Sequence, residues 1–109
     1  MNIIDFHVHI FPDKIAEKAA RAVGKFYDIP MALDGKLSTA LTCMNRAGIR
    51  RFVAHSVATT PAQVESINRF ILAAHAAYPD RILPFAALHP DLPDVEKTWT
   101  RSSAPAFWG

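Results

Sequence analysis

Cysteine and net charge are both scarce in this chain, and each scarcity excludes a class of protein. The single cysteine, Cys43, cannot form a disulfide within the chain. A cross-linked secreted scaffold is therefore excluded, and a reducing compartment is favoured. The formal charge is only +2, from 12 Lys and Arg against 10 Asp and Glu, and the cationic residues form no cluster. The composition predicts no nucleic-acid partner and no membrane-surface partner.

Long hydrophobic runs are also missing. No stretch approaches the roughly 20 apolar residues that span a bilayer. Asp5 interrupts the apolar N-terminal segment, where a secretory signal would otherwise lie. Half of the 109 residues are nevertheless hydrophobic, which is enough to build the core of one small domain. We therefore expect a soluble, cytoplasmic domain with no membrane partner.

The hydrophobic pattern switches repeatedly between strand and helix. Short apolar runs predict three strands, over residues 2–10, 51–55 and 82–88. Apolar residues at helical spacing predict helices over residues 12–26, 38–47 and 60–78, and a further helix that begins within residues 92–97. This order of strands and helices predicts an α/β fold with a parallel sheet and right-handed crossovers.

A His-Val-His pair ends the first expected strand. Because side chains alternate along a strand, His7 and His9 should share one face with Asp5. The other face should pack normally through Phe6, Val8 and Ile10. Two adjacent imidazoles can chelate a divalent metal ion. A pair of hydrogen-bonded or surface histidines is the alternative interpretation.

Histidine also ends the other two expected strands, at His55 and His89. The carboxyl ends of parallel strands lie at one edge of a sheet, where α/β folds place their chemistry. This coincidence favours a functional rim, although a single histidine at a strand end often bonds only to loop backbone. His75 lies in the middle of an expected helix and is predicted to be at the surface of that helix.

Three segments stand out in order along the chain: Ile-Asp-Phe-His-Val-His-Ile-Phe-Pro at residues 4–12, Ala-Gly-Ile-Arg-Arg-Phe-Val at residues 47–53 and Phe-Ala-Ala-Leu-His-Pro at residues 85–90. Together they resemble the amidohydrolase-related family of metal-dependent hydrolases, and in particular its branch that contains aminocarboxymuconate-semialdehyde decarboxylase. The resemblance covers residues 1–97. The set of motifs, in this order and at this spacing, is more specific than the histidine pair alone.

The resemblance implies a (β/α)8 TIM barrel with one divalent metal ion, commonly zinc, at its carboxyl rim. In the family, the histidine pair of the first strand ligates this metal, which carries over to His7 and His9. Family members act on small-molecule substrates, by hydrolysing C–N, C–O or C–C bonds or by decarboxylation. The metal lowers the pKa of a bound water. Asp5 is expected to orient a ligand through a hydrogen bond.

The chain departs from the family in size. A TIM barrel needs eight βα units and typically about 250 residues, so this chain is expected to form the first three units of an incomplete barrel. It is expected to be inactive alone and to self-associate through the open edge of its third strand. The alternative is a non-catalytic α/β module that binds metal weakly or completes its sheet with a partner. The substrate stays open.

Residues 98–109 differ in character from the preceding part of the chain. They are not amphipathic, and they are expected to break the helix that begins just before them. Reading the possible codons one base earlier, from the Lys97 codon onward, yields an amphipathic helix, a glycine stop and the start of a strand. Our hypothesis is that a frameshift truncated a longer gene here. A natural, divergent tail is the alternative.

Overall fold

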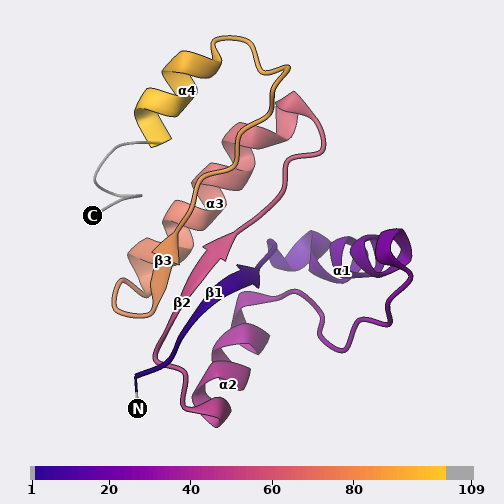
Figure 1. Cartoon of the computed structure of the whole chain (residues 1–109), viewed down its shortest axis with the longest axis vertical. Helices are drawn as coiled ribbons and strands as arrows, with labels where there is room; N and C mark the ends of the chain where they lie inside the picture. The colour runs from indigo at the N-terminus through magenta and orange to yellow at the C-terminus, as the bar shows by residue number, and fades with distance from the viewer. Residues whose placement is uncertain (1, 103–109) are drawn as a thin grey trace.

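Three parallel strands form one open sheet in the order β1-β2-β3 (Figure 1). The computed structural model describes residues 2–102, without the side chains of residues 99, 101 and 102. The strands are β1 (Ile4–His9), β2 (Arg51–His55) and β3 (Ile82–Pro84). The predicted α/β class and parallel pairing are therefore confirmed, and the bounds of β2 are those that the apolar run predicts.

Helices connect these strands close to the predicted bounds. They are α1 (Asp13–Tyr27), α2 (Leu37–Ala47), the single-turn 3-10 helix η1 (Pro61–Gln63), α3 (Val64–Ala77) and α4 (Val95–Ser102). Gly48 ends α2 with a φ of 69°, a left-handed conformation that glycine adopts at little cost. Among the described residues, no helix is long and apolar enough to cross a membrane.

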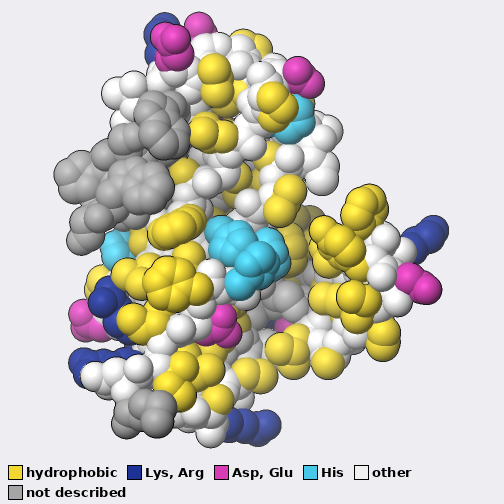
Figure 2. Space-filling view, viewed as in Figure 1, with side chains coloured by type: hydrophobic (Ala, Val, Ile, Leu, Met, Phe, Trp, Pro, Cys, Tyr) yellow, Lys and Arg dark blue, Asp and Glu magenta, His cyan; other side chains and the backbone are white. Residues whose placement is uncertain are grey.

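One face of the sheet is covered by α2 and α3. Phe52 and Ala54 alternate onto this face, where they join a core to which both helices contribute. The buried members of this core are Ile10, Met44, Phe52, Ala54, Ile71, Ala74 and Ile82. By strand alternation Val53 and His55 lie on the opposite face, where Val53 is also buried. Figure 2 shows a group of histidine side chains exposed at the centre of the molecule, among hydrophobic side chains.

A bulge in β1 makes one prediction about this strand wrong. Asp5 pairs with Phe52 and Val8 pairs with Ala54. Between these two pairs the chain moves three residues along β1 but only two along β2. The extra residue interrupts the strict alternation of side chains. Phe6 was expected to pack beside Ile10, but Phe6 is 67% exposed, whereas Ile10 is fully buried.

The third strand is shorter than the predicted range of residues 82–88. Its last residue, Pro84, has no N–H to donate to a ladder, although the next N–H, that of Phe85, still donates to Ala54 O at 3.0 Å. Further along, Asn68 of α3 takes the place of a strand partner. Its Oδ1 accepts the Ala87 N–H at 2.7 Å, and its Nδ2 donates to Ala87 O at 3.0 Å.

Asn68→Ala is expected to lower the free energy of unfolding by about 2–4 kcal/mol, because it removes two hydrogen bonds and leaves buried backbone groups without partners. Asn68 is 9% exposed and is the buried polar residue of the described core. Urea unfolding measures the change. The matched control is Asn45→Ala, at an exposed position of α2, which should change stability by less than about 0.5 kcal/mol. Equal effects of the two substitutions would contradict this role.

The predicted helix break at Thr98 is also wrong. The helix α4 continues to Ser102, with the Thr98 N–H donating to Asp94 O at 3.2 Å and Thr100 Oγ1 donating to Glu96 O at 2.9 Å. No glycine or proline lies between residues 98 and 102, so nothing in the local sequence stops the helix. Residues 103–109 lie outside the described part of the chain, and the frameshift account stays a hypothesis.

Candidate metal centre

Three histidines meet at the carboxyl ends of β1 and β2. His7 Nε2 lies 3.0 Å from His9 Nε2, a hydrogen bond whose donor depends on the tautomers of the two rings, so the pair is hydrogen-bonded as the alternative interpretation expects. The His55 ring centroid lies 4.6 Å from that of His7 and 4.4 Å from that of His9. One nitrogen of each ring can be chosen so that all three lie within 4.8 Å of one another. The predicted pair is therefore adjacent, and a third imidazole stands beside it.

Strand register brings the third histidine to the pair. His9 and His55 are directly paired residues of β1 and β2. Neighbouring parallel strands lie about 4.8 Å apart, and paired side chains project to the same face. The two rings must therefore stand side by side. His7 lies two residues before His9 and reaches the same group, since its ring centroid is 4.8 Å from that of His9.

A loop contact fixes the chain directly after His9. The Phe11 N–H donates to Gly35 O at 2.9 Å, and Phe11 forms an isolated parallel bridge with Lys36. Gly35 has a φ of +78°, and a Cβ built there would lie 2.9 Å from the Phe11 ring. Only glycine suits both the left-handed backbone and this close approach. The end of β1 is thereby held to the loop that precedes α2.

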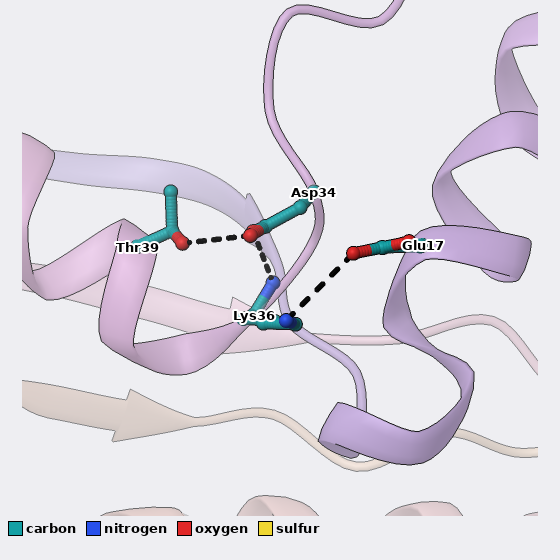
Figure 3. Close-up of polar contacts among 4 residues, drawn as sticks. All are labelled: Glu17, Asp34, Lys36 and Thr39. Atoms are coloured by element: carbon teal, nitrogen blue, oxygen red, sulfur yellow. Dashed lines mark hydrogen bonds and ion pairs between the residues drawn. The ribbon is translucent and has the colours of Figure 1, made fainter.

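Polar side chains hold that loop in turn (Figure 3). Asp34 Oδ1 accepts the Lys36 N–H at 3.0 Å, and Asp34 Oδ2 accepts the Thr39 hydroxyl at 3.0 Å. The hydrogen bond from the Lys36 backbone has the larger effect and that from Thr39 the next, and both lower the pKa of Asp34. Lys36 Nζ also lies 3.8 Å from Glu17 Oε1 of α1. The cluster therefore ties the loop to α1 and to the first turn of α2.

Asp5 does not have the role that the sequence predicts for it. Its Oδ1 accepts the backbone N–H of His7 at 3.0 Å, so its hydrogen bond goes to the strand and not to an imidazole. The bulge of β1 opposes Asp5 to Phe52, which separates it from the alternation that His7 and His9 follow. Asp5 therefore supports the backbone that carries the histidines. Nothing in the local sequence marks the bulge.

The other two histidines lie outside the cluster. His89 does not end a strand as predicted, because β3 ends at Pro84, and its Nδ1 accepts the Asp91 N–H of the same loop at 3.1 Å. His75 lies 2.8 Å from Ile82 O through its Nδ1. It is half-buried between α3 and β3, so the prediction of a purely surface histidine is wrong. His89 and His75 thus have structural partners.

Burial keeps two of the clustered imidazoles neutral. Loss of water lowers the pKa of His9, the charge of His7 lowers it further, and a hydrogen bond to the His55 backbone partly opposes these effects. Burial, followed by the charges of His9 and His7, likewise lowers the pKa of His55. Unperturbed histidine titrates near pH 6.5. Both rings are therefore mostly neutral near pH 7, the form in which imidazole binds a metal ion.

Acid should destabilise the fold through these two histidines. In the unfolded chain they bind protons below about pH 6.5, whereas the folded pKa values are lower, so the unfolded state holds more protons in that range. The free energy of unfolding should therefore be at its full value above about pH 6.5 and fall as the pH drops through the folded pKa values. Urea midpoints between about pH 5 and pH 8 test this. The fall should be smaller in His55→Gln, and equal slopes in both proteins would contradict the assignment.

The spacing of the histidine pair suits a zinc ion. Two Zn–N bonds of about 2.05 Å at the tetrahedral angle hold their nitrogens about 3.3 Å apart. The separation of 3.0 Å between His7 Nε2 and His9 Nε2 needs only a small adjustment of the rings. Uncharged imidazole nitrogen is also a preferred ligand for zinc. The residues present therefore fit the metal that the family resemblance implies.

Comparison with known proteins returns no relative. No protein-family model matches the chain, and no curated protein matches it significantly.

Proposed function

We propose that this chain carries the first metal ligands of an amidohydrolase-related enzyme, a metal-dependent hydrolase of C–N, C–O or C–C bonds or a decarboxylase. One observation carries the proposal. The Nε2 atoms of His7 and His9 lie 3.0 Å apart at the carboxyl end of a parallel sheet, where α/β enzymes place their chemistry. Zinc is the proposed metal, and a small molecule is the proposed substrate.

The open three-stranded sheet is compatible with being part of a larger TIM barrel. Helices cover one face of the sheet, and β1 and β3 are its two edges within the described residues. In a barrel the face opposite α2 and α3 would become the packed interior, and each edge strand would gain a neighbour. The histidines would then lie at the carboxyl rim of the barrel, above its core.

The residues of this chain have separate tasks in such a site. A bound divalent metal would polarise the substrate and lower the pKa of water at neutral pH. His7 and His9 would hold it as neutral bases, and the lowered pKa of His9 keeps protons from competing for its nitrogen. Asp5 holds the backbone of His7, and the loop at Gly35 holds the end of β1.

The reading frame after the Lys97 codon tests the proposal. Nucleotide sequencing is expected to find, in another frame, further strands with the later histidines and the late aspartate that the family resemblance implies. The frame-restored protein, loaded with zinc, should turn over an amide, ester or carboxymuconate-type substrate, and His7→Ala should abolish that turnover. The 109-residue chain should be inactive. The absence of a long open frame, or turnover by the short chain that is lost in His7→Ala, would contradict the incomplete-barrel account.

A non-catalytic α/β module is the alternative function. Such a module would bind zinc and show no turnover in either form of the protein. We favour the enzyme because the pair lies at the carboxyl end of its strand, and because the motifs at residues 4–12, 47–53 and 85–90 follow the order of the family.

Self-association through the open edge stays a prediction. Leu83 of β3 is half-buried, Phe85 is 40% exposed, and Phe6 of β1 is 67% exposed. Open strand edges beside apolar side chains promote pairing between chains. Sedimentation of the purified chain should therefore reveal dimers or larger species that grow with concentration. A monomer with a sharp, cooperative melt would count against this expectation.

A further inference from the structure

We infer that His55 is a third metal ligand, so that His7, His9 and His55 form a three-nitrogen zinc centre within this chain. The inference rests on the proposed role of His7 and His9 as metal ligands. The family resemblance assigns no role to His55, which belongs to the second strand. Its assignment comes from the geometry of the cluster alone.

The geometry places His55 within reach of the same ion. Its ring lies 4.4 Å from that of His9 and 4.6 Å from that of His7, measured between centroids. The ligand nitrogens of the three rings lie within 4.8 Å of one another. Tetrahedral zinc needs about 3.3 Å between them, and rotation of the His55 side chain can supply this difference. The backbone pairing of His9 with His55 fixes the two attachment points and needs no change.

The chemistry of the cluster favours a cation at its centre. Three imidazoles face one another, with ring centroids 4.4 to 4.8 Å apart, and each can present one nitrogen to a shared ion. The Asp5 carboxylate accepts a bond from the His7 backbone and not from a ring. His7 Nε2 and His9 Nε2 lie at hydrogen-bond distance, 3.0 Å apart, and a divalent ion would replace that bond with bonds to three nitrogen lone pairs.

Three histidines are also the number that a catalytic zinc site uses. Such sites take three protein ligands and leave the fourth position open. With His55 included, the chain holds the metal without any ligand from a further strand. Three neutral ligands leave the full +2 charge of the ion at the site, which favours an anion or a polarised oxygen in the open position.

Titration of the wild-type chain with Zn²⁺ and with Co²⁺ tests this inference. Calorimetry should show one tight site per chain, and Co²⁺ should give the intense visible absorption of a tetrahedral site. His55→Ala should weaken Zn²⁺ binding by about 100-fold, at least the loss that follows removal of an outer-shell partner. The matched control is His89→Ala, which removes a loop histidine outside the cluster and should leave the affinity unchanged.

His55→Cys keeps the inference testable if His55→Ala fails to fold. A thiolate at this position should retain Co²⁺ and add a near-ultraviolet sulfur-to-cobalt charge-transfer band. The wild-type chain, which has Cys43 on α2, should show no such band. Wild-type affinity in folded His55→Ala, or Co²⁺ bound to His55→Cys without the band, would overturn the inference. Tight binding that depends on His55, with no turnover by the frame-restored protein, would support it while the proposed function fails.

Discussion

His9→Ala is expected to abolish tight zinc binding, with a loss of more than about 100-fold, because it removes a direct ligand and not an outer-shell partner. The imidazole of His9 is the centre of the cluster. Its Nε2 lies 3.0 Å from that of His7, and its ring lies 4.4 Å from that of His55. Calorimetric titration with Zn²⁺ near pH 7.5, above the ordinary pKa of histidine, measures the loss.

The fold of His9→Ala should survive, because the His9 ring is only partly buried and such positions contribute little packing energy. The apo forms of variant and wild type should therefore unfold at similar urea concentrations. His89→Gln, outside the cluster, should bind zinc as the wild type does. If His9→Ala retains wild-type affinity, the metal centre is elsewhere and the account of β1 fails.

Phe52→Ala is expected to lower the free energy of unfolding by about 3–5 kcal/mol, the usual cost of truncating a buried aromatic side chain. Phe52 is fully buried, and it packs in the core between the sheet and helices α2 and α3. Small domains have only about 5–15 kcal/mol of stability in total, so the variant should be largely unfolded at modest urea concentrations. Urea unfolding followed by circular dichroism measures the change.

Phe26→Ala is the matched control for the core. The same side chain is removed from a position that is 82% exposed, and the stability should change by less than about 0.5 kcal/mol. A small effect at Phe52 together with a large effect at Phe26 would mean that the core lies against α1, and that the face of β2 assigned to the core is wrong.

Hydrophobic periodicity predicts most of the fold because it reports which face of each element is buried. The run Arg51–His55 is a strand at its predicted bounds, and the amphipathic segment after Pro12 forms α1. The predictions fail where tertiary contacts decide. The side chain of Asn68 hydrogen-bonds the backbone N–H and C=O of Ala87, 19 residues away. These backbone groups therefore have a partner outside the sheet, and β3 ends before Ala87. A bulge that pairs Asp5 with Phe52 moves Asp5 away from its expected role.

In the candidate site, too, the sequence predicts the local feature and misses the one that depends on tertiary contacts. The pairing of His7 with His9 is local, since both lie on one strand two residues apart, and the sequence predicts it. The arrival of His55 depends on the register of two strands whose paired histidines are separated by a whole helical crossover. The position of His55 at a strand end marks it as a candidate, but pattern alone cannot choose between it and His89, which lies at the end of another expected strand.

X-ray absorption at the zinc edge of the loaded chain tests the central claim most directly, because it reports the ligands of the metal without requiring turnover. The claim is that zinc is held by histidines at the ends of β1 and β2. We expect a shell of nitrogen atoms at about 2.0 Å with the multiple-scattering signature of three imidazoles, and of two in His55→Ala. A wild-type spectrum fitted by oxygen ligands alone, without imidazole scattering, would contradict the account.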